Sequence, residues 1–301
     1  MISKLITIWV QIRDLYLYLF RRALILNGYA DDHTWMGVRH RNWGDELNYY
    51  FVSQLTGRPV IFYHTFRVAK WLGLKNYLCI GTLLDAVSYS NRSTVVWGTG
   101  VSGQDRDFVL PQKICSVRGR KTYEFLKNKG IDCPSVFGDP ALLLPRFYTP
   151  KRMEKRYKLG VIPHVIDWDY DVMCKIRKER NDILVIDLAH YGKWTDVIDQ
   201  ICSCDAIASS SLHGLIVSDA YNVPNCWITL SGNISGGLFK YFDYFSSVGR
   251  EEVGPVKVER MPDLQTIESK MVSWKPITID TDQILNSCPF YGASLLSTRF
   301  L

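Results

Sequence analysis

Short apolar runs rich in β-branched residues alternate with helix-like segments along most of this chain, and this alternation constrains the fold more than any other feature. In the first half, strands are predicted at residues 59–63, 77–80, 93–97 and 114–117, and helices at residues 45–55 and 121–129. Strands that alternate with helices form crossover units, which make neighbouring strands parallel. The first 150 residues therefore predict an α/β domain with a parallel sheet.

The pattern starts again after a basic stretch at residues 151–158. Strands are predicted at residues 159–162, 183–188, 205–208 and 226–230, and helices at residues 170–180, 195–202 and 212–221. Four buried strands with three crossover helices make a second doubly wound unit. We therefore predict an α/β fold of two Rossmann-like doubly wound domains, residues 1–150 and 151–301, which face a cleft that takes the ligands.

The two halves carry charge of opposite sign. Residues 1–160 contain 24 Lys and Arg against 12 Asp and Glu, whereas residues 161–301 contain 12 against 18. A basic domain attracts an anionic partner, such as a membrane surface, a phosphorylated ligand or nucleic acid. We expect no nucleic-acid partner, because the basic stretch at residues 151–158 contains few aromatic residues.

Residues 2–20 are rich in Ile, Leu, Trp and Tyr, so a membrane segment has to be considered. A spanning helix needs about 20 nearly uncharged residues. Here Lys4, Arg13 and Asp14 interrupt the apolar run, whose longest charge-free part is residues 5–12. Two interpretations stay open: a helix that packs its apolar side on the first domain, or an interfacial helix whose aromatic residues enter the headgroup layer of an anionic membrane.

The eight cysteines are scattered, without a CxxC pair or a spacing of Cys and His that suits zinc. A chain of this size can bury a core large enough to fold without disulfides. We therefore predict free thiols in a reducing, cytoplasmic compartment, and no metal site.

The strongest local motif is Ser209-Ser-Ser-Leu-His-Gly214, a polar turn between a predicted strand and a helix. Small residues there leave the backbone N–H groups of the helix N-terminus able to bind an anion, which the helix dipole also favours. His213 lies in the first turn, where it can act as an acid, a base or a hydrogen-bond donor. The alternative is a serine N-cap followed by a half-buried structural histidine.

Other candidate residues stand at the ends of predicted strands. His164 follows the strand at residues 159–162. A lone histidine is usually structural, but two at neighbouring strand ends make a functional role an equal alternative. Arg118 also follows a strand, where it either grips an anion or is merely solvated. Asp45 is interpreted on composition as the N-cap of a helix. Gly98-Thr-Gly-Val-Ser-Gly103 matches GxGxxG, but no amphipathic helix follows it, so we predict no dinucleotide site there.

Six short pieces occur in a characteristic order between roughly residues 40 and 230. They are Asn42-Trp-Gly-Asp-Glu-Leu47, Trp97-Gly-Thr-Gly100, Val117-Arg118, Gly138-Asp-Pro140, Ile162-Pro-His164 and Ser210-Ser-Leu-His-Gly214. In this order they resemble the polysaccharide pyruvyl transferase family. The resemblance implies two Rossmann-like domains arranged as in GT-B glycosyltransferases, with phosphoenolpyruvate as donor and a sugar diol as acceptor.

The resemblance also implies roles for individual residues. The second domain is expected to bind the donor and the basic first domain the acceptor, with His213 and His164 as the catalytic residues. The expected donor-binding residues are Ser210, Ser211, Leu212, Gly214 and Arg118, and the expected acceptor-side residues are Asn42, Gly44, Asp45, Gly98 and Gly100. Two departures concern the grip on the donor: family members often carry Arg at the position of Ser211 and an acidic residue at the position of Gly119.

The chemistry of ketal formation agrees with these residue types. Phosphoenolpyruvate carries a phosphate and a carboxylate, so its site needs cations and helix-terminal N–H groups. The methylene carbon must receive a proton, which is a task for histidine near neutral pH, and no metal or organic cofactor is needed.

The resemblance and the basic, apolar N-terminal part also suggest where such an enzyme acts. The expected acceptor is a sugar, by analogy galactose, of an undecaprenyl-diphosphate-linked oligosaccharide in capsule or exopolysaccharide synthesis. The expected location is the cytoplasm or the inner face of the cytoplasmic membrane. Two alternatives stay open: a nucleotide-sugar glycosyltransferase of GT-B fold, and a non-catalytic saccharide-binding relative.

Overall fold

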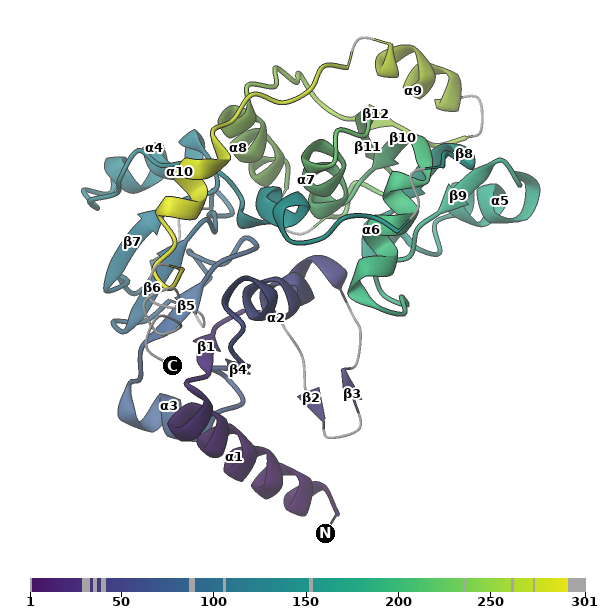
Figure 1. Ribbon diagram of the computed structural model, residues 1–301. Coiled ribbons are helices and arrows are strands. Elements are labelled where there is room, and N and C mark those ends of the chain that lie inside the picture. The colour runs from purple at the N-terminus through teal and green to yellow at the C-terminus, as the bar shows by residue number, and fades with distance from the viewer. Residues whose placement is uncertain are drawn as a thin grey trace. The chain divides into compact units, whose positions relative to one another are not determined.

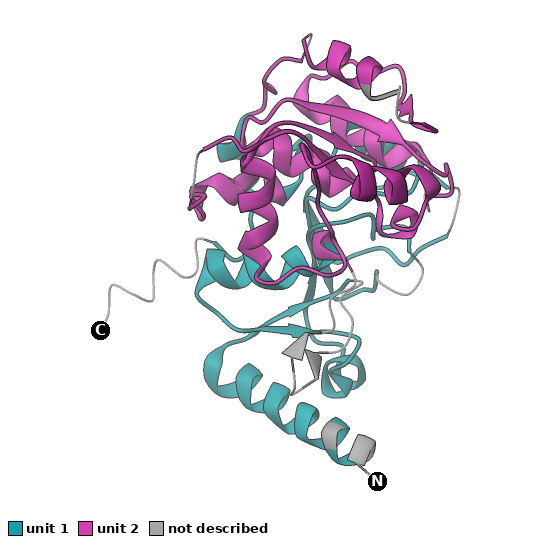
Figure 2. Ribbon diagram, turned by 90° about the vertical axis from the view of Figure 1, so that its right-hand side faces the viewer, with its two compact units in different colours: residues 1–40, 45–140, 280–301 teal, residues 41–44, 141–279 magenta. Residues whose placement is uncertain are grey.

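The computed structural model describes residues 2–28, 33–34, 37–38, 42–86, 90–104, 107–151, 154–234, 237–260, 263–272 and 274–291. Contacts divide the chain into two compact units, shown in Figure 2. Unit 1 comprises residues 1–40, 45–140 and 280–301, and unit 2 comprises residues 41–44 and 141–279. The C-terminal residues from 280 onward therefore group with the first unit, whereas the division expected from the sequence assigned them to the second.

Unit 1 is built on a five-stranded sheet in the order β4-β1-β5-β6-β7 (Figure 1). Its strands are β1 Leu24–Leu26, β4 Val60–Phe62, β5 Asn76–Leu78, β6 Thr94–Trp97 and β7 Lys113–Ser116. All neighbouring strands are parallel, and every residue of β1, β4 and β6 is buried, which explains their apolar composition. In chain order this is the 2-1-3-4-5 topology, whose switch point lies between β1 and β5.

The helices of unit 1 are α1 Ile2–Arg21, α2 Trp43–Thr56, α3 Arg67–Leu72, α4 Arg120–Asn128 and α10 Thr281–Asn286. The two-residue strands β2 His33–Thr34 and β3 Gly37–Val38 pair antiparallel. The first two residues of α2 group with unit 2. Within the described ranges, no helix combines the length and the apolar character needed to cross a membrane.

The C-terminal segment is anchored to the sheet of unit 1 by aromatic side chains. The indole N–H of Trp97 donates to the carbonyl of Ile284 in α10 (2.9 Å). The ring of Phe290 packs edge-on against Trp97 and Tyr77, with centroid distances of 5.4 and 5.1 Å. These contacts are the physical reason why residues after 280 belong to unit 1.

Unit 2 has the same topology in its own sheet, ordered β12-β11-β10-β8-β9. Its strands are β8 Tyr157–Ile162, β9 Ile183–Val185, β10 Cys204–Ser209, β11 Asn225–Thr229 and β12 Val256–Lys257, all parallel. Its helices are α5 Asp171–Glu179, α6 Trp194–Cys202, α7 Leu212–Ala220, α8 Phe239–Val248 and α9 Asp263–Met271, with 3-10 turns η1 Pro140–Arg146 and η2 Val165–Asp167. Its switch point lies between β8 and β10.

The structure confirms the predicted α/β class with two parallel, Rossmann-like sheets. The predicted strands and helices are present, with boundaries that differ by up to three residues. The sequence pattern missed β1, because this central strand has three residues and follows α1 so closely that both form one apolar stretch. It also missed α3, α10 and β12, which are too short to show a period, and the helices α8 and α9.

Candidate active site

The switch point of unit 2 brings two sequence motifs together. β8 ends at Ile162 and the chain continues to His164, while β10 ends at Ser209 and continues to Ser210. Ser209 pairs with Ile162 across the sheet, and the backbone N–H of His164 donates to Ser210 Oγ (2.8 Å). In doubly wound sheets, ligands bind outside the carboxyl ends of the strands at this point. This edge is therefore the candidate ligand site of unit 2.

A buried carboxylate ties three strand ends together at this edge. Asp167 is fully buried and accepts hydrogen bonds from the hydroxyls of Ser210 (3.4 Å) and of Ser231, which follows β11. The Tyr241 hydroxyl on α8 donates to the carbonyl of Ser210 (2.6 Å), and its ring stacks on Trp227 at 4.6 Å. Burial, with Asp167 nearby, raises the pKa of Tyr241, so its hydroxyl remains a donor.

The turn before α7 depends on Ser209 and Gly214. Ser209 Oγ donates to the carbonyl of Ser211 (2.8 Å) and accepts the backbone N–H of the same residue (3.0 Å). A Cβ at Gly214 would lie 2.3 Å from Ser209 Oγ, so only glycine fits there. Ser211 is the N-cap residue of α7, yet its side chain makes no capping hydrogen bond within the described structure. A helix N-terminus whose N–H groups lack a side-chain cap favours the binding of an external anion.

His213 lies against Gly44 within unit 2. The side chain is buried, with 8% of its surface exposed, and a Cβ at Gly44 would lie 1.9 Å from its Nδ1. Trp43 fixes this contact, since its backbone N–H donates to the Leu188 carbonyl and its indole N–H to the Trp194 carbonyl, both at 2.8 Å. Because only glycine lets the backbone come this close, Gly44 is a positioning residue for His213.

At the same strand edge, the charge of Lys240 acts on His164. Burial and the nearby Lys240 ammonium lower the pKa of His164 to about 4, while Asp167 acts in the opposite direction. His164 is therefore neutral at pH 7. Its Nδ1 accepts the backbone N–H of Ile166 (3.4 Å), which assigns the ring proton to Nε2. Lys240 on α8 is buried as well, and its positive charge beside a neutral imidazole suits a bound anion.

Unit 2 thus collects most of the residues predicted for donor binding and catalysis. At the carboxyl ends of β8 and β10 or directly after them lie His164, Ser210, Ser211, Leu212, His213 and Gly214. Gly44, which was predicted on the acceptor side, lies against His213. Their individual roles in binding remain predictions. Ser210 has both its hydroxyl and its carbonyl engaged within unit 2, so its contribution there is to hold His164 and Asp167 in place.

Arg118 lies in the interior of unit 1. It is fully buried, and its guanidinium donates to the carbonyls of Gly81 (3.3 Å) and Val101 (3.2 Å) and to Thr82 Oγ1 (2.7 Å). A Cβ at Gly100 would lie 2.4 Å from Arg118 Cζ, so this glycine makes room for the guanidinium. The interpretation of Arg118 as merely solvated was wrong, because its donors join the loops after β5 and β6. Its predicted contact with the donor stays a prediction.

Another motif glycine of unit 1 serves close packing in a similar way. Gly98 has a φ of +84°, and a Cβ there would lie 2.3 Å from Cδ of Pro140 in the Gly-Asp-Pro motif. The backbone N–H of Gly138 donates to the carbonyl of Val117 (3.0 Å). The three motifs after β6, after β7 and at Pro140 therefore pack as one layer at the carboxyl edge of unit 1. An acceptor role for Gly98 and Gly100 stays a prediction.

The Asn-Trp-Gly-Asp motif lies at the start of α2, and Asn42 caps this helix. Its Oδ1 accepts the backbone N–H of Gly44 (3.1 Å), and α2 begins at the residue between them. The prediction of Asp45 as the N-cap was wrong, because the helix starts two residues earlier than expected. Asp45 lies instead in the first turn of α2, where a negative charge interacts favourably with the helix dipole.

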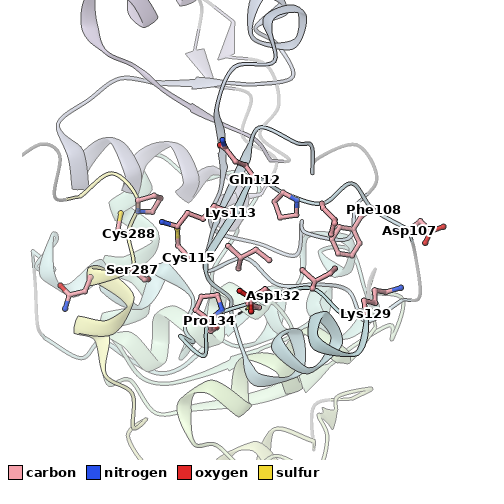
Figure 3. A pocket seen from close by; sticks show the side chains of 18 residues that line it. Asp107, Phe108, Gln112, Lys113, Cys115, Lys129, Asp132, Pro134, Ser287 and Cys288 are labelled. Carbon is pink, nitrogen blue, oxygen red and sulfur yellow. Dashed lines mark hydrogen bonds between the residues drawn. The ribbon is translucent and has the colours of Figure 1, made fainter.

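A cavity of about 1170 Å³ opens in unit 1 beside the edge strand β7 (Figure 3). It is lined by residues of β7, by residues 129–134 and by residues 286–289. None of the predicted site residues lines this cavity. It lies along the flank of the sheet, so its size alone gives no reason to place the chemistry there.

The side chains that could bind a metal ion are His, Cys, Asp and Glu. In the part of the chain that the structure describes, no three His, Cys, Asp or Glu side chains are grouped so that they could hold a metal ion. All eight cysteines are free thiols. The sequence also predicts that the protein needs no cofactor, and this stays a prediction.

The sequence pattern missed three buried polar residues at the carboxyl ends of the strands in the two sheets. Asp167 and Lys240 belong to the site in unit 2, and Lys240 lies on a helix that the sequence pattern did not predict. Asn48 of α2 donates to the carbonyl of Ile80 and accepts its N–H, both at 2.8 Å, which ties α2 to the end of β5. Asn48 lies on the apolar side of the predicted helix at residues 45–55, and this position could have indicated a buried polar role for it.

The fold and the strand-end residues define a two-unit α/β protein whose second unit offers a candidate anion site with two histidines. Comparison with known families gives a specific assignment. Residues 70–232 match the family described as polysaccharide pyruvyl transferase, and this chain belongs to that family.

Two relatives are similar over most of the chain. "Uncharacterized protein L143" of Acanthamoeba polyphaga mimivirus is 30% identical over 218 residues, which cover 71% of this chain and 73% of that protein. "Succinoglycan biosynthesis protein ExoV" of Rhizobium meliloti (strain 1021) is 26% identical over 216 residues, which cover 70% of this chain and 63% of that protein. The matched part of the ExoV protein is thus less than two thirds of its length.

Proposed function

We propose that this protein is a pyruvyltransferase that uses phosphoenolpyruvate to form a pyruvate ketal on a sugar during surface polysaccharide biosynthesis. The observation that carries the proposal is the convergence of His164, His213 and Lys240 at the carboxyl ends of β8 and β10. Family membership and the similarity to a succinoglycan biosynthesis protein support the class of reaction. A GT-B-like arrangement of the two units belongs to this proposal.

Lys240 is the proposed cation for the donor. The family pattern often has an arginine at the position of Ser211; here Lys240 on α8, whose charge acts on His164, would supply the positive charge instead. The N-terminus of α7 adds a second favourable interaction for phosphate or carboxylate. Arg118 hydrogen-bonds within unit 1, so we propose Lys240 as the first contact with the donor and keep Arg118 as a further candidate.

His213 is the proposed acid and base. It would deliver a proton to the methylene carbon of phosphoenolpyruvate, which generates an oxocarbenium-like C2. One sugar hydroxyl then bonds to C2, the C2–O bond to phosphate breaks, and a second hydroxyl closes the ketal. Of the two protons released by the sugar hydroxyls, one returns to His213, which gave its proton to the methylene carbon, and the other leaves with phosphate. His164, neutral at pH 7, would donate a hydrogen bond from Nε2.

The proposed acceptor is a sugar, with galactose as the first candidate, of an undecaprenyl-diphosphate-linked oligosaccharide. Such an acceptor would be met at the inner face of the cytoplasmic membrane. Unit 1 contains 18 Lys and Arg against 13 Asp and Glu, and this positive balance supports an anionic, diphosphate-bearing acceptor on its side. We propose that the reaction proceeds without a metal or organic cofactor.

The decisive experiment is to incubate the full chain with phosphoenolpyruvate and a panel of oligosaccharide acceptors. We expect acceptor-dependent release of phosphate, together with a mass increase of one pyruvyl ketal on one acceptor. Turnover with a nucleotide sugar and none with phosphoenolpyruvate would replace the proposal by a glycosyltransferase. Thermal stabilisation by saccharides without turnover of either donor would leave a binding protein.

A further inference from the structure

The outward side of α1 carries a continuous apolar stripe. Eight large side chains on this helix are between 37% and 71% exposed: Leu5, Ile8, Trp9, Ile12, Leu15, Tyr16, Leu19 and Phe20. They recur at intervals of three and four residues, so they share one side of the helix. A helix of 20 residues is about 30 Å long, and an apolar stripe of that length is more than a monomer normally exposes to water.

The opposite side of α1 is fixed to unit 1. Gln11 donates to the carbonyl of Thr65 (2.7 Å) and accepts the backbone N–H of Arg67 (2.8 Å). Leu17 and Tyr18 pack against a buried cluster formed by β1, β4 and α3. Figure 1 shows α1 beside α3, along the outer side of this unit. Because these contacts determine the rotation of the helix, the apolar stripe faces away from the core.

α3 extends this surface. Trp71 is 84% exposed and Leu72 is 55% exposed at the end of α3. Residues 2–22 and 67–75 together contain seven Lys and Arg against a single acidic residue, Asp14, which is buried. The two helices and the residues that directly follow them therefore combine exposed apolar and aromatic side chains with positive charge. We call α1 and α3 together the α1/α3 surface.

Charge distinguishes the occupants that could cover this surface. A second copy of the chain would bring two positively charged surfaces together, which opposes association. An anionic bilayer has the opposite charge, and its headgroup layer takes up Trp and Tyr rings and Leu and Ile side chains from a helix that lies in its plane. Basic residues beside such an interface are attracted to an anionic leaflet and so strengthen binding.

We propose that the α1/α3 surface docks the protein on a membrane that contains anionic phospholipid, with α1 parallel to the membrane plane. The proposal specifies which residues make the membrane contact assumed for the lipid-linked acceptor. It is tested by binding alone, so its failure and the failure of the pyruvyltransferase proposal can be told apart.

The test is co-sedimentation of the full chain with vesicles of phosphatidylcholine and phosphatidylglycerol. We expect binding to these vesicles and much weaker binding to pure phosphatidylcholine. Raising the salt concentration from about 0.1 M to about 1 M should weaken binding, because the screening length falls from about 10 Å to about 3 Å. The triple variant Ile8→Ser, Ile12→Ser, Leu19→Ser should lower the partition coefficient at least about tenfold, since three apolar contacts with the membrane are lost.

A matched control removes exposed apolar side chains elsewhere. Val253 and Val272 of unit 2 are 96% and 89% exposed, and Val253→Ser with Val272→Ser should leave vesicle binding unchanged. Thermal unfolding of each variant checks that it is folded, which we expect because all substituted residues are exposed. Turnover on a short water-soluble acceptor should be the same in the triple variant and the parent chain.

Three results would overturn the proposal. The first is that the folded parent chain does not bind anionic vesicles. The second is that the folded triple variant binds them as well as the parent does. The third is that sedimentation velocity shows a dimer of the parent chain that the triple variant abolishes, because a second copy would then cover the surface.

Discussion

At the scale of single residues, the two histidines of the proposed site differ in what their neighbours do to them. His164 is kept neutral by burial and by the charge of Lys240. His213 is positioned by the close approach of Gly44. This difference is the reason to assign the proton transfer to His213 and a hydrogen-bonding role to His164.

The first prediction concerns His213. The variant His213→Ala should lower turnover by about 10²–10⁴-fold, the usual effect of removing a general acid or base. Phosphate release with saturating phosphoenolpyruvate and acceptor measures the effect. The control is His190→Ala, which removes a side chain that is 80% exposed in unit 2 and should not change turnover. Loss of only a few-fold in the His213 variant would transfer the role to His164.

The second prediction concerns the pKa of His164, which an NMR titration can follow. Lys240→Met should raise this pKa from about 4 toward the ordinary value of about 6.5, because a positive charge that opposes protonation is lost. The control Lys275→Met removes an exposed lysine of unit 2 and should leave the titration unchanged. An unchanged pKa in the Lys240 variant would contradict the coupling.

The same pKa predicts how stability depends on pH. Between about pH 6.5 and pH 4 the unfolded chain binds a proton at His164 that the folded chain does not, so the free energy of unfolding falls as the pH is lowered through this range. The contribution is about 1–3 kcal/mol, reduced by partial solvent exposure. Urea unfolding at a series of pH values should show a weaker dependence in His164→Asn than in the parent chain.

At the scale of elements, both sheets end in layers where glycines admit buried side chains. Gly100 makes room for the guanidinium of Arg118, and the hydrogen bonds of Arg118 join the loops that follow β5 and β6. The match to GxGxxG thus has a packing explanation, because the space beside Gly100 is filled by protein.

The variant Gly100→Ala tests this packing. The added methyl group would overlap the Arg118 guanidinium, and overpacking of this kind costs about 1–3 kcal/mol. The control is Gly254→Ala, since nothing lies within 4 Å of a Cβ at that position. Urea denaturation should show a lower free energy of unfolding for Gly100→Ala alone. Equal stability of both variants would mean that Arg118 moves aside at no cost.

At the scale of the whole molecule, the chain leaves unit 1 after Pro140 and returns to it at Asp280. The returning segment contributes Phe290, which is buried against Trp97 and Tyr77. Unit 1 is therefore built from segments that precede and follow unit 2 in the sequence. This also explains why a division at residue 150 does not describe the first unit.

The variant Phe290→Ala should destabilise unit 1 by about 3–5 kcal/mol, the usual cost of removing a buried aromatic ring. Trp71→Ala is the matched control, because its side chain is 84% exposed and its loss should change stability little. Chemical denaturation followed by circular dichroism measures both. An equal effect of the two substitutions would show that the C-terminal segment does not support the sheet.

The sequence by itself determined the α/β class, most of the strands and helices, and the family. Buried parallel strands need continuous apolar runs and crossover helices need polar faces, so these elements are visible in local patterns. The same holds for the Ser209–Gly214 turn, whose small residues are local requirements of a strand-to-helix turn.

Only the tertiary structure decided which residues meet at the strand ends. The contact of Gly44 with His213, the burial of Arg118 and the approach of Lys240 to His164 join segments that are far apart in the sequence. The structure also decided that one side of α1 packs while the other stays exposed. The helix is apolar on both sides, so its periodicity could not tell which side the core would take.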